Sequence, residues 1–142
     1  LMTSLTALRQ AGKEVPDAII VGTSYGMLEN SEKFLLDLCR EGEDGLSPTL
    51  FMQSTHNTVA GALAIRTHCH GYNITYTRLG EEETLDLCRR DAERLMRLGR
   101  IRNALIGYHN EVTPALHDMV WRLRGEDLPV GVTSTAMFLE KR

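Results

Sequence analysis

The sequence predicts an α/β sandwich with a mostly parallel sheet. Helical and strand patterns alternate along the chain in the order α-β-α-α-β-α-β-α-β, which is typical of helices that cover both faces of one sheet. Two continuous apolar runs, residues 18–21 and 104–108, indicate strands buried on both faces, as strands of parallel sheets are. No repeat, low-complexity segment or linker interrupts this order, so residues 1–142 are expected to form a single domain.

Composition excludes several classes of protein. The 142 residues are 42% hydrophobic and 25% charged, which is enough apolar sequence for a core. A net charge of −3 argues against a dedicated nucleic-acid binder, which would usually be basic. The sequence has neither a signal peptide nor a long apolar run, so no membrane span is expected. Three cysteines without a CxxC pair make structural disulfides unexpected and fit a reducing cytoplasm: Cys39, Cys69 and Cys88.

Two helices, a strand and a turn are expected before residue 47. The first helix covers residues 1–10, where Leu1, Leu5 and Leu8 share one face. The strand at residues 18–21 leads into a tight turn, residues 22–26. Because this turn lacks the lysine of a P-loop and the G-x-G-x-x-G of a dinucleotide site, a structural turn is favoured over phosphate binding. The next helix is expected to begin at a Ser31 cap and to stop at Gly42, with three apolar side chains directed inward: Phe34, Leu35 and Leu38.

Residues 47–80 are expected to form the functional region. An extended segment from Ser47 leads into a polar turn at residues 53–58, and then into a helix whose small residues let another backbone come close. A buried strand follows at residues 72–77, alternating around Ile74 and Tyr76. A polar loop, a small-residue helix and a strand in this order are a usual way to build an interface or an active site into an α/β protein.

The rest of the chain predicts two more helices and two more strands. The longest helix covers residues 81–98 and is ended by Gly99. Its first turn carries three glutamates, where negative charge suits the helix dipole. Its buried side consists of Leu85, Cys88, Ala92, Leu95 and Met96. After the strand at residues 104–108, Thr113 and Pro114 are expected to begin a helix that ends at Gly125 and turns inward Leu116, Val120 and Leu123. Residues 130–140 are the last strand.

Several short motifs resemble those of a known family. They are Ile19-Ile20-Val21-Gly22-Thr23-Ser24-Tyr25-Gly26, Ser47-Pro48, Ser54-Thr55 with Asn57, Val59-Ala60-Gly61, Gly71, and Asn103-Ala104-Leu105-Ile106-Gly107 with Glu111 and Thr113-Pro114. In this order and spacing, over about residues 3–140, they resemble the β-ketoacyl-ACP synthases of the thiolase-like superfamily. The segments QSTHNT and CHGYN are most similar to the divergent synthase-like subunits of aryl-polyene and flexirubin-type pigment pathways.

The resemblance implies a fold and the position of a nucleophile. The fold is a three-layer α/β/α half-domain whose last strand is antiparallel, with the strand order 72–77, 18–21, 104–108 and 130–140. The nucleophilic cysteine of the family corresponds to Gly80, which has no side chain to acylate. Synthases also use two His, or a His and an Asn, from a second half that these 142 residues lack. Because the first residue is Leu1, a fragment and a processed product are both open.

Few other side chains are candidates for catalysis or metal binding. A helix N-terminus lowers the pKa of a cysteine thiol in synthases, whereas Glu81, Glu82 and Glu83 would add negative charge at this one. His109 and Glu111 follow a strand end and are the remaining candidates for an acid–base pair. His68, Cys69 and His70 are types that ligate zinc, but no second ligand pair has standard spacing, so neither a metal nor a cofactor is expected.

The resemblance also implies partners. Synthases dimerise through the strand equivalent to residues 73–77, so a homodimer, or a heterodimer with an intact β-ketoacyl synthase, is expected. The residues implied at that interface or at the acyl tunnel are Ser54, Thr55, His56, Asn57 and Arg78. On the longest helix, an arginine face either pairs with nearby carboxylates or docks an acidic acyl carrier protein: Arg90, Arg94 and Arg97.

The predicted function is therefore a non-catalytic subunit, similar to a chain length factor, in fatty-acid or polyketide-type biosynthesis. Two alternatives remain open at this stage. One is an active 3-oxoacyl-ACP synthase or acyltransferase component, completed by another chain or using His109 and Glu111. The other is a small-ligand or metal-binding α/β module that uses residues 22–26 or the His-Cys-His segment. Neither the acyl substrate nor the identity of the partner can be read from the sequence.

Overall fold

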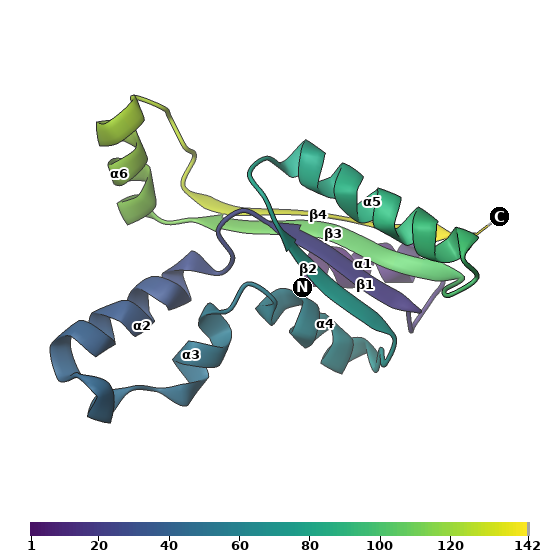
Figure 1. Ribbon diagram of the computed structural model, residues 1–142, viewed down its shortest axis with the longest axis horizontal. Helices are drawn as coiled ribbons and strands as arrows, with labels where there is room; N and C mark the ends of the chain where they lie inside the picture. Colours follow the sequence, from purple (N-terminus) through teal and green to yellow (C-terminus); the bar gives the residue numbers. More distant parts are fainter. Residues whose placement is uncertain (142) are drawn as a thin grey trace.

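A computed structural model describes residues 1–141 (Figure 1). The elements in chain order are α1 (Met2–Gln10), β1 (Ala18–Thr23), α2 (Leu28–Glu41), a short 3-10 turn η1 (Glu43–Gly45), α3 (Pro48–Ser54), α4 (Thr58–Thr67), β2 (Tyr72–Thr77), α5 (Glu81–Arg97), β3 (Asn103–Val112), α6 (Pro114–Arg124) and β4 (Gly131–Glu140). Within the described residues, no helix is long and apolar enough to cross a membrane.

The strands form one mixed sheet in the order β2-β1-β3-β4. β1 runs parallel to both β2 and β3, with Ile20 opposite Ile74 on one side and opposite Ile106 on the other. β4 runs antiparallel to β3 along its whole length, from Asn103 opposite Glu140 to Val112 opposite Gly131. The predicted strand order and the antiparallel last strand are both confirmed, and β2 and β4 are the two edge strands.

Two apolar layers cover the sheet, one on each face. α5 lies on one face, and α1 and α4 lie on the other (Figure 1). Alternation along β1 divides its side chains between the layers, because neighbouring residues of a strand point to opposite faces. The α5 layer contains Ala18, Ile20, Cys88, Ala92, Leu95, Met96, Ile101, Ala104 and Ile106. The opposite layer contains Leu8, Ile19, Val21, Ala60, Leu63, Cys69 and Leu105.

The predicted helix ends are largely confirmed. Thr113 caps α6 by accepting the N–H of Leu116, and Pro114 follows at the first helical position, where its missing N–H leaves no bond unmade. Gly42, Gly99 and Gly125 follow α2, α5 and α6 with φ between 67° and 70°, a conformation that glycine adopts without strain.

The region between β1 and α4 differs from the prediction. Ser47 and Pro48 do not lead an extended segment. Ser47 accepts the N–H of Leu50 and caps the additional helix α3, whose last two residues take up the start of the expected polar turn. Ser31 is not a cap either, because α2 begins three residues earlier, and its hydroxyl donates to the carbonyls of Met27 and Ser54. A Ser-Pro pair fits both an extended segment and a helix start, and only the packing of α3 on α2 decides between them.

Three helices are less buried than their sequences predict. α2, α3 and α6 contain no buried residue, and all three extend beyond the carboxyl end of the parallel strands (Figure 1). Leu35 is 56% exposed and Leu123 is 77% exposed, although both were expected to point inward. Their amphipathic patterns are real, but the described residues place no sheet beneath these helices. β2 is likewise half-buried rather than buried, because it is an edge strand.

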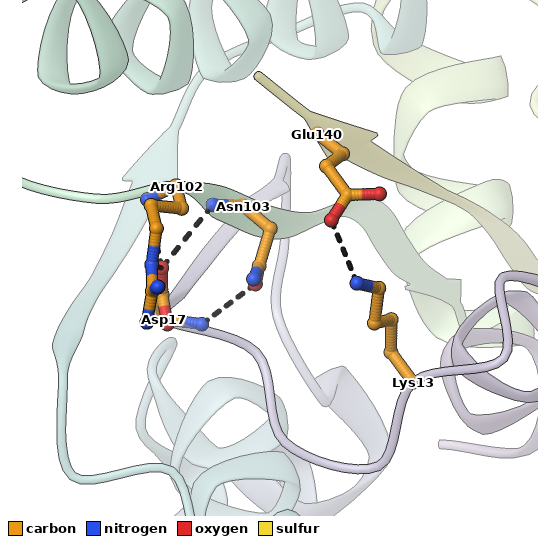
Figure 2. Close-up of polar contacts among 5 residues, drawn as sticks. All are labelled: Lys13, Asp17, Arg102, Asn103 and Glu140. Atoms are coloured by element: carbon orange, nitrogen blue, oxygen red, sulfur yellow. Dashed lines mark hydrogen bonds and ion pairs between the residues drawn. The ribbon is translucent and has the colours of Figure 1, made fainter. Parts of the chain in front are cut away.

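Polar contacts join the segments at the amino end of the sheet (Figure 2). The Asp17 carboxylate accepts the N–H groups of Arg102 and Asn103, at 2.7 and 3.3 Å, while the Asn103 side chain accepts the N–H of Asp17 at 2.9 Å. These bonds fix the start of β3 beside the start of β1. Lys13 and Glu140 form an ion pair of 2.7 Å that links the α1–β1 connection to the end of β4.

Candidate functional site at the carboxyl end of the sheet

The turn that follows β1 is held by a side chain from β3. Asn110 is buried, and its Oδ1 accepts the N–H groups of Tyr25 (2.8 Å) and Ser24 (3.2 Å) as well as the Thr23 hydroxyl (3.3 Å). The N–H of Gly26 donates to Thr23 Oγ1 at 2.8 Å. These amide donors therefore already have partners inside the protein, which leaves this turn without the free N–H groups that a phosphate cradle needs.

Gly80 lies immediately before α5, at the end of the connection from β2. Its φ of 90° is one that residues with side chains rarely adopt, although a Cβ at this position would meet no atom within 4 Å. The Arg78 N–H donates to the Thr23 carbonyl, and the Arg78 carbonyl accepts the Ser24 hydroxyl at 2.9 Å. The Thr84 hydroxyl donates to the Gly80 carbonyl, one turn below. The end of β2 is thus joined both to the β1 turn and to α5.

A close approach between β1 and α5 positions the start of that helix. A Cβ added to Gly22 would lie 2.0 Å from Cγ2 of Thr84, a distance at which atoms overlap. Thr84 is fully buried, so the first turn of α5 packs directly on the glycine backbone of β1. Only a residue without a side chain at position 22 lets the helix begin where it does.

The first turn of α5 is strongly acidic. Glu81, Glu82 and Glu83 occupy it, and Glu81 accepts the hydroxyl of Thr135 from β4, while Glu83 lies 3.6 Å from Arg78. Carboxylates at a helix N-terminus are favoured by the dipole but compete with any other anion there. This helix start is therefore less suited to stabilising a thiolate or an oxyanion than one without the glutamates.

His109 is a buried link between three elements. It is 6% exposed, and its Nε2 shares a hydrogen bond of 3.0 Å with Ser4 of α1, while its Nδ1 shares one of 2.7 Å with Ser134 of β4. Burial lowers the pKa of His109 to about 4. Glu111 has a different partner, the N–H of Glu29 at 2.8 Å. With both ring nitrogens engaged and a lowered pKa, this imidazole holds α1 on the sheet rather than standing free as a base.

The predicted interface residues lie on the α3–α4 connection and after β2. Ser54 and Thr55 donate to backbone carbonyls of α3, and Thr55 also donates to the Asn57 side chain at 2.8 Å. His56 is exposed and lies against Gly26 of the β1 turn. Arg78 is exposed beside the acidic start of α5. The structure thus brings His56 close to the β1 turn, whereas Ser54, Thr55 and Asn57 mainly order their own connection.

Of the three α5 arginines predicted to dock a carrier protein, two are paired within the helix. Arg90 forms an ion pair with Asp86, and Arg94 lies 3.6 Å from the buried carboxylate of Asp91. Arg97 forms no ion pair within residues 1–141. The same Asp91 accepts the Tyr72 hydroxyl at 3.1 Å, so it joins the edge strand β2 to α5.

The cysteines and histidines do not gather into a ligand set. Cys69 is buried, while His68 and His70 on either side of it are exposed, so the tripeptide points in different directions. Among residues 1–141, no cluster of three His, Cys, Asp or Glu side chains could hold a metal ion. Cys88 lies in the core under α5, and burial raises the pKa of its thiol to about 12. The Cys88 thiol therefore stays protonated near neutral pH and is not a candidate nucleophile.

The sequence did not identify the polar residues that assemble this region. Asn110 and Ser134 carry the turn and the buried histidine, and neither belongs to a motif with a recognised chemistry. One signal is present for Asn110, since it lies just after the apolar run 104–108; the strand, however, continues to Val112, so Asn110, His109 and Glu111 lie within β3 and not after its end. No local pattern marks Ser4, whose role depends on where α1 packs.

Comparisons with known proteins find similarity in structure only. No family model matches the sequence, and no curated protein is similar to it. The chain is similar to the ishigamide ketosynthase/chain length factor, with a TM-score of 0.75 and 26% identity over 87% of this chain and 35% of that chain. It is also similar to the structure of a ketosynthase (ApeO) in complex with its chain length factor (ApeC) from Xenorhabdus doucetiae, with a TM-score of 0.72 and 23% identity over 98% of this chain and 54% of that chain.

A third similar structure is AntDE:AntF, a type II PKS acyl-carrier protein in complex with its ketosynthase bound to the hexaketide. Here the TM-score is 0.68 and the identity 15%, over 89% of this chain and 40% of that chain. The chain therefore spans between about a third and about half of the length of the chains that it matches. The predicted resemblance to ketosynthase-type proteins and the predicted thiolase-like half-domain fold are both confirmed.

Proposed function

We propose that this chain is a non-catalytic subunit of the chain-length-factor type, which pairs with an intact β-ketoacyl synthase and shapes its acyl site. One observation carries the proposal: Gly80 occupies the residue between the edge strand and the start of α5, where the sequence resemblance aligns the nucleophilic cysteine. A glycine there offers no atom that can form a thioester. The ketosynthase and chain-length-factor structures that resemble this chain support the same reading.

The acidic first turn of α5 agrees with a lost nucleophile. A synthase gains from a helix N-terminus that is free to stabilise a thiolate, since the dipole lowers the thiol pKa. Three carboxylates in that turn work against this effect. A subunit that never carries the acyl chain has no such requirement, and its helix is stabilised by the same glutamates.

Pairing is proposed through the open edge of β2. The inner edge of this strand is bonded to β1, so its outer edge is available to a strand of a second subunit. The residues proposed to line the interface or the acyl tunnel are Ser54, Thr55, His56, Asn57 and Arg78. The partner is either a second copy or, for activity, an intact synthase. The three free cysteines are compatible with a reducing compartment, and we place the subunit in the cytoplasm.

Acyl transfer tests the proposal directly. The chain is incubated with an acylated acyl carrier protein, and its intact mass is measured. We expect no added acyl group on the wild type, and none on Gly80→Cys, because the acidic helix start disfavours a thiolate at position 80. An acyl adduct on the wild-type chain would overturn the proposal and favour the alternative of an active acyltransferase component.

Association is tested at the two sheet edges. Thr77 is exposed on β2 and Thr133 is exposed on β4, so Thr77→Lys and Thr133→Lys form a matched pair. A lysine on a pairing edge disfavours strand addition, because its charge would have to be buried. Light scattering with an intact ketosynthase should show that only Thr77→Lys weakens the complex. If only Thr133→Lys weakened the complex, the interface would lie at β4, and the proposal of pairing through β2 would be wrong.

Carrier-protein docking is proposed at the arginine face of α5, namely Arg90, Arg94 and Arg97. Arg97 is the member without an intrahelical carboxylate, whereas Arg94 is already neutralised in part by Asp91. Arg97→Glu should therefore slow association with an acidic carrier protein more than Arg94→Glu does. The difference should fall as salt is raised, because the Debye length shortens from roughly 10 Å at 0.1 M to 3 Å at 1 M.

A further inference from the structure

A cleft of about 600 Å³ lies at the amino end of the sheet, opposite the end that carries Gly80. Three connections form it: the segment before β1, the α4–β2 connection and the α5–β3 connection. Its lining consists of Val15, Pro16, Asp17, His68, His70, Gly71, Gly99, Arg100, Ile101 and Arg102. None of these positions takes part in the proposed subunit function.

The polar lining of this cleft is mainly cationic or hydrogen-bond donating. Arg100 and Arg102 come from one connection, and His68 and His70 come from another, so four donor side chains from distant parts of the chain border one space. Asp17 is the only carboxylate in the lining, and it accepts the N–H groups of Arg102 and of the following residue (Figure 2). Its negative charge is therefore partly satisfied by the start of β3 and partly by the Arg102 guanidinium, whose Nε lies 4.0 Å from Asp17 Oδ2.

Helix capping does not account for these basic residues. α4 and α5 both end at the cleft, and cations often compensate the negative ends of helix dipoles. Here, however, backbone donors already satisfy the last carbonyls. The N–H of Cys69 donates to Ala64 at 3.0 Å, and the N–H of Arg100 donates to Leu95 at 2.9 Å, which is the bond expected of a Schellman-type ending. Arg102 lies 4.0 Å from the Asp17 carboxylate and is 89% exposed, whereas Arg100 forms no ion pair within residues 1–141, so the Arg100 guanidinium is the more available of the two.

The backbone of His68 provides a second, independent observation. His68 closes α4 in the left-handed conformation, with φ of 53°, and is the one residue other than glycine with positive φ among residues 1–141. The equivalent position after α5 is Gly99, with φ of 69°. A side chain in this conformation is strained relative to glycine, so the fold holds an imidazole at the cleft where glycine would be more stable.

We propose that this cleft binds a phosphoryl group, either as free phosphate or as a phosphate ester. Arg100 supplies forked donors that match phosphate oxygens, Arg102 beside Asp17 can supply more, and the imidazoles of His68 and His70 come from a different connection. The site is separate from Gly80 and from the edge of β2, so its presence or absence leaves the proposed subunit function untouched.

Calorimetric titration of the 142-residue chain tests the proposal at 150 mM salt, with pyrophosphate, inorganic phosphate and a nucleoside monophosphate as probes. Arg100→Ala and Arg102→Ala should each weaken binding roughly tenfold, as expected for the loss of a charge-assisted hydrogen bond. Arg124→Ala, which alters an exposed arginine at the end of α6 and outside the cleft, is the matched control and should bind as the wild type does. Equal affinity for phosphate and for the monoester supports a site for free phosphate, and tighter binding of the monoester supports an ester.

His68→Gly separates ligand binding from folding. This substitution should raise the midpoint of thermal unfolding, because it relieves the left-handed strain, and should still weaken phosphate binding. Absence of binding at millimolar probe would overturn the proposal, and so would equal losses in Arg100→Ala and Arg124→Ala. Binding of a polyglutamate peptide without binding of any phosphate probe would also overturn it, since the cleft would then recognise acidic protein.

Discussion

Replacing His109 by glutamine should make the stability of this protein less sensitive to acid. In the wild type, burial lowers the pKa of His109 from its usual 6.5 to about 4, so the folded state strongly favours the neutral ring. A lowered histidine pKa means that stability is fully present above the unfolded pKa and is lost as the pH falls through the folded pKa. The relevant window is therefore between about pH 6.5 and pH 4.

The magnitude follows from the size of the shift. One pKa unit corresponds to roughly 1.4 kcal/mol, so protonation of His109 should remove about 3 kcal/mol between pH 7 and pH 4. That is a large share of the roughly 5–15 kcal/mol by which a domain is stable. At pH 7 the glutamine variant should be less stable than the wild type, because the buried Ser4 hydroxyl loses its partner, at a cost of about 1–3 kcal/mol.

Urea unfolding at a series of pH values measures this effect. Carboxylates titrate in the same range, so the quantity to follow is the difference in free energy of unfolding between the wild type and His109→Gln. That difference should shrink or change sign as the pH falls from 7 to 4. His70→Gln, which alters an exposed imidazole, serves as the control for a histidine-to-glutamine change as such. A difference for His109→Gln that does not vary with pH would refute a buried, neutral histidine.

Three further substitutions test the scaffold of the candidate site. Gly22→Ala should destabilise the fold by about 1–3 kcal/mol, because its Cβ would overlap Thr84 Cγ2. Adding Thr84→Ser removes that methyl group and should restore most of the lost stability. If urea unfolding shows no such rescue, this contact is not the cause of the loss. Asn110→Ala should cost about 1–3 kcal/mol by leaving backbone donors of the β1 turn unpaired, with faster amide exchange confined to that turn. Asp91→Asn should lower the pKa of Tyr76, which burial and then Asp91 raise to about 12, and an unchanged ultraviolet titration would contradict that role of the carboxylate.

Strong periodicity and turn chemistry are sufficient to predict the individual strands and the start of α6. The apolar runs of β1 and β3, and the Thr-Pro start of α6, are local signals that packing did not override. The strand order and the direction of β4 came from family resemblance, because pairing between distant strands leaves no mark on a single sequence. Ser47-Pro48 was misread, since the same pair begins a helix or an extended segment and only α2 decides between them.

The side chains that matter at the candidate site were harder to predict. Gly80 is identified from the sequence only because the family motif has a cysteine at this position, and glycine lacks its sulfur. His109 was found as a polar residue after an apolar run, but its burial depends on Ser4 and Ser134, which lie 105 and 25 residues away in the sequence. Inward-facing residues of α2 and α6 were overpredicted for a related reason. Amphipathic periodicity shows which face of a helix seeks an apolar partner, not whether the described chain supplies one.

The scaffold around Gly80 and the chemistry expected of that position depend on different residues. Gly22 and Thr84 set where α5 begins, and Asn110 holds the turn beside it. None of these contacts needs a side chain at position 80, so the nucleophile can be lost while the start of α5 stays in place. A subunit that only shapes a neighbouring acyl site requires this backbone and not the thiol. We therefore expect substitutions at Gly22, Thr84 and Asn110 to impair assembly and product length.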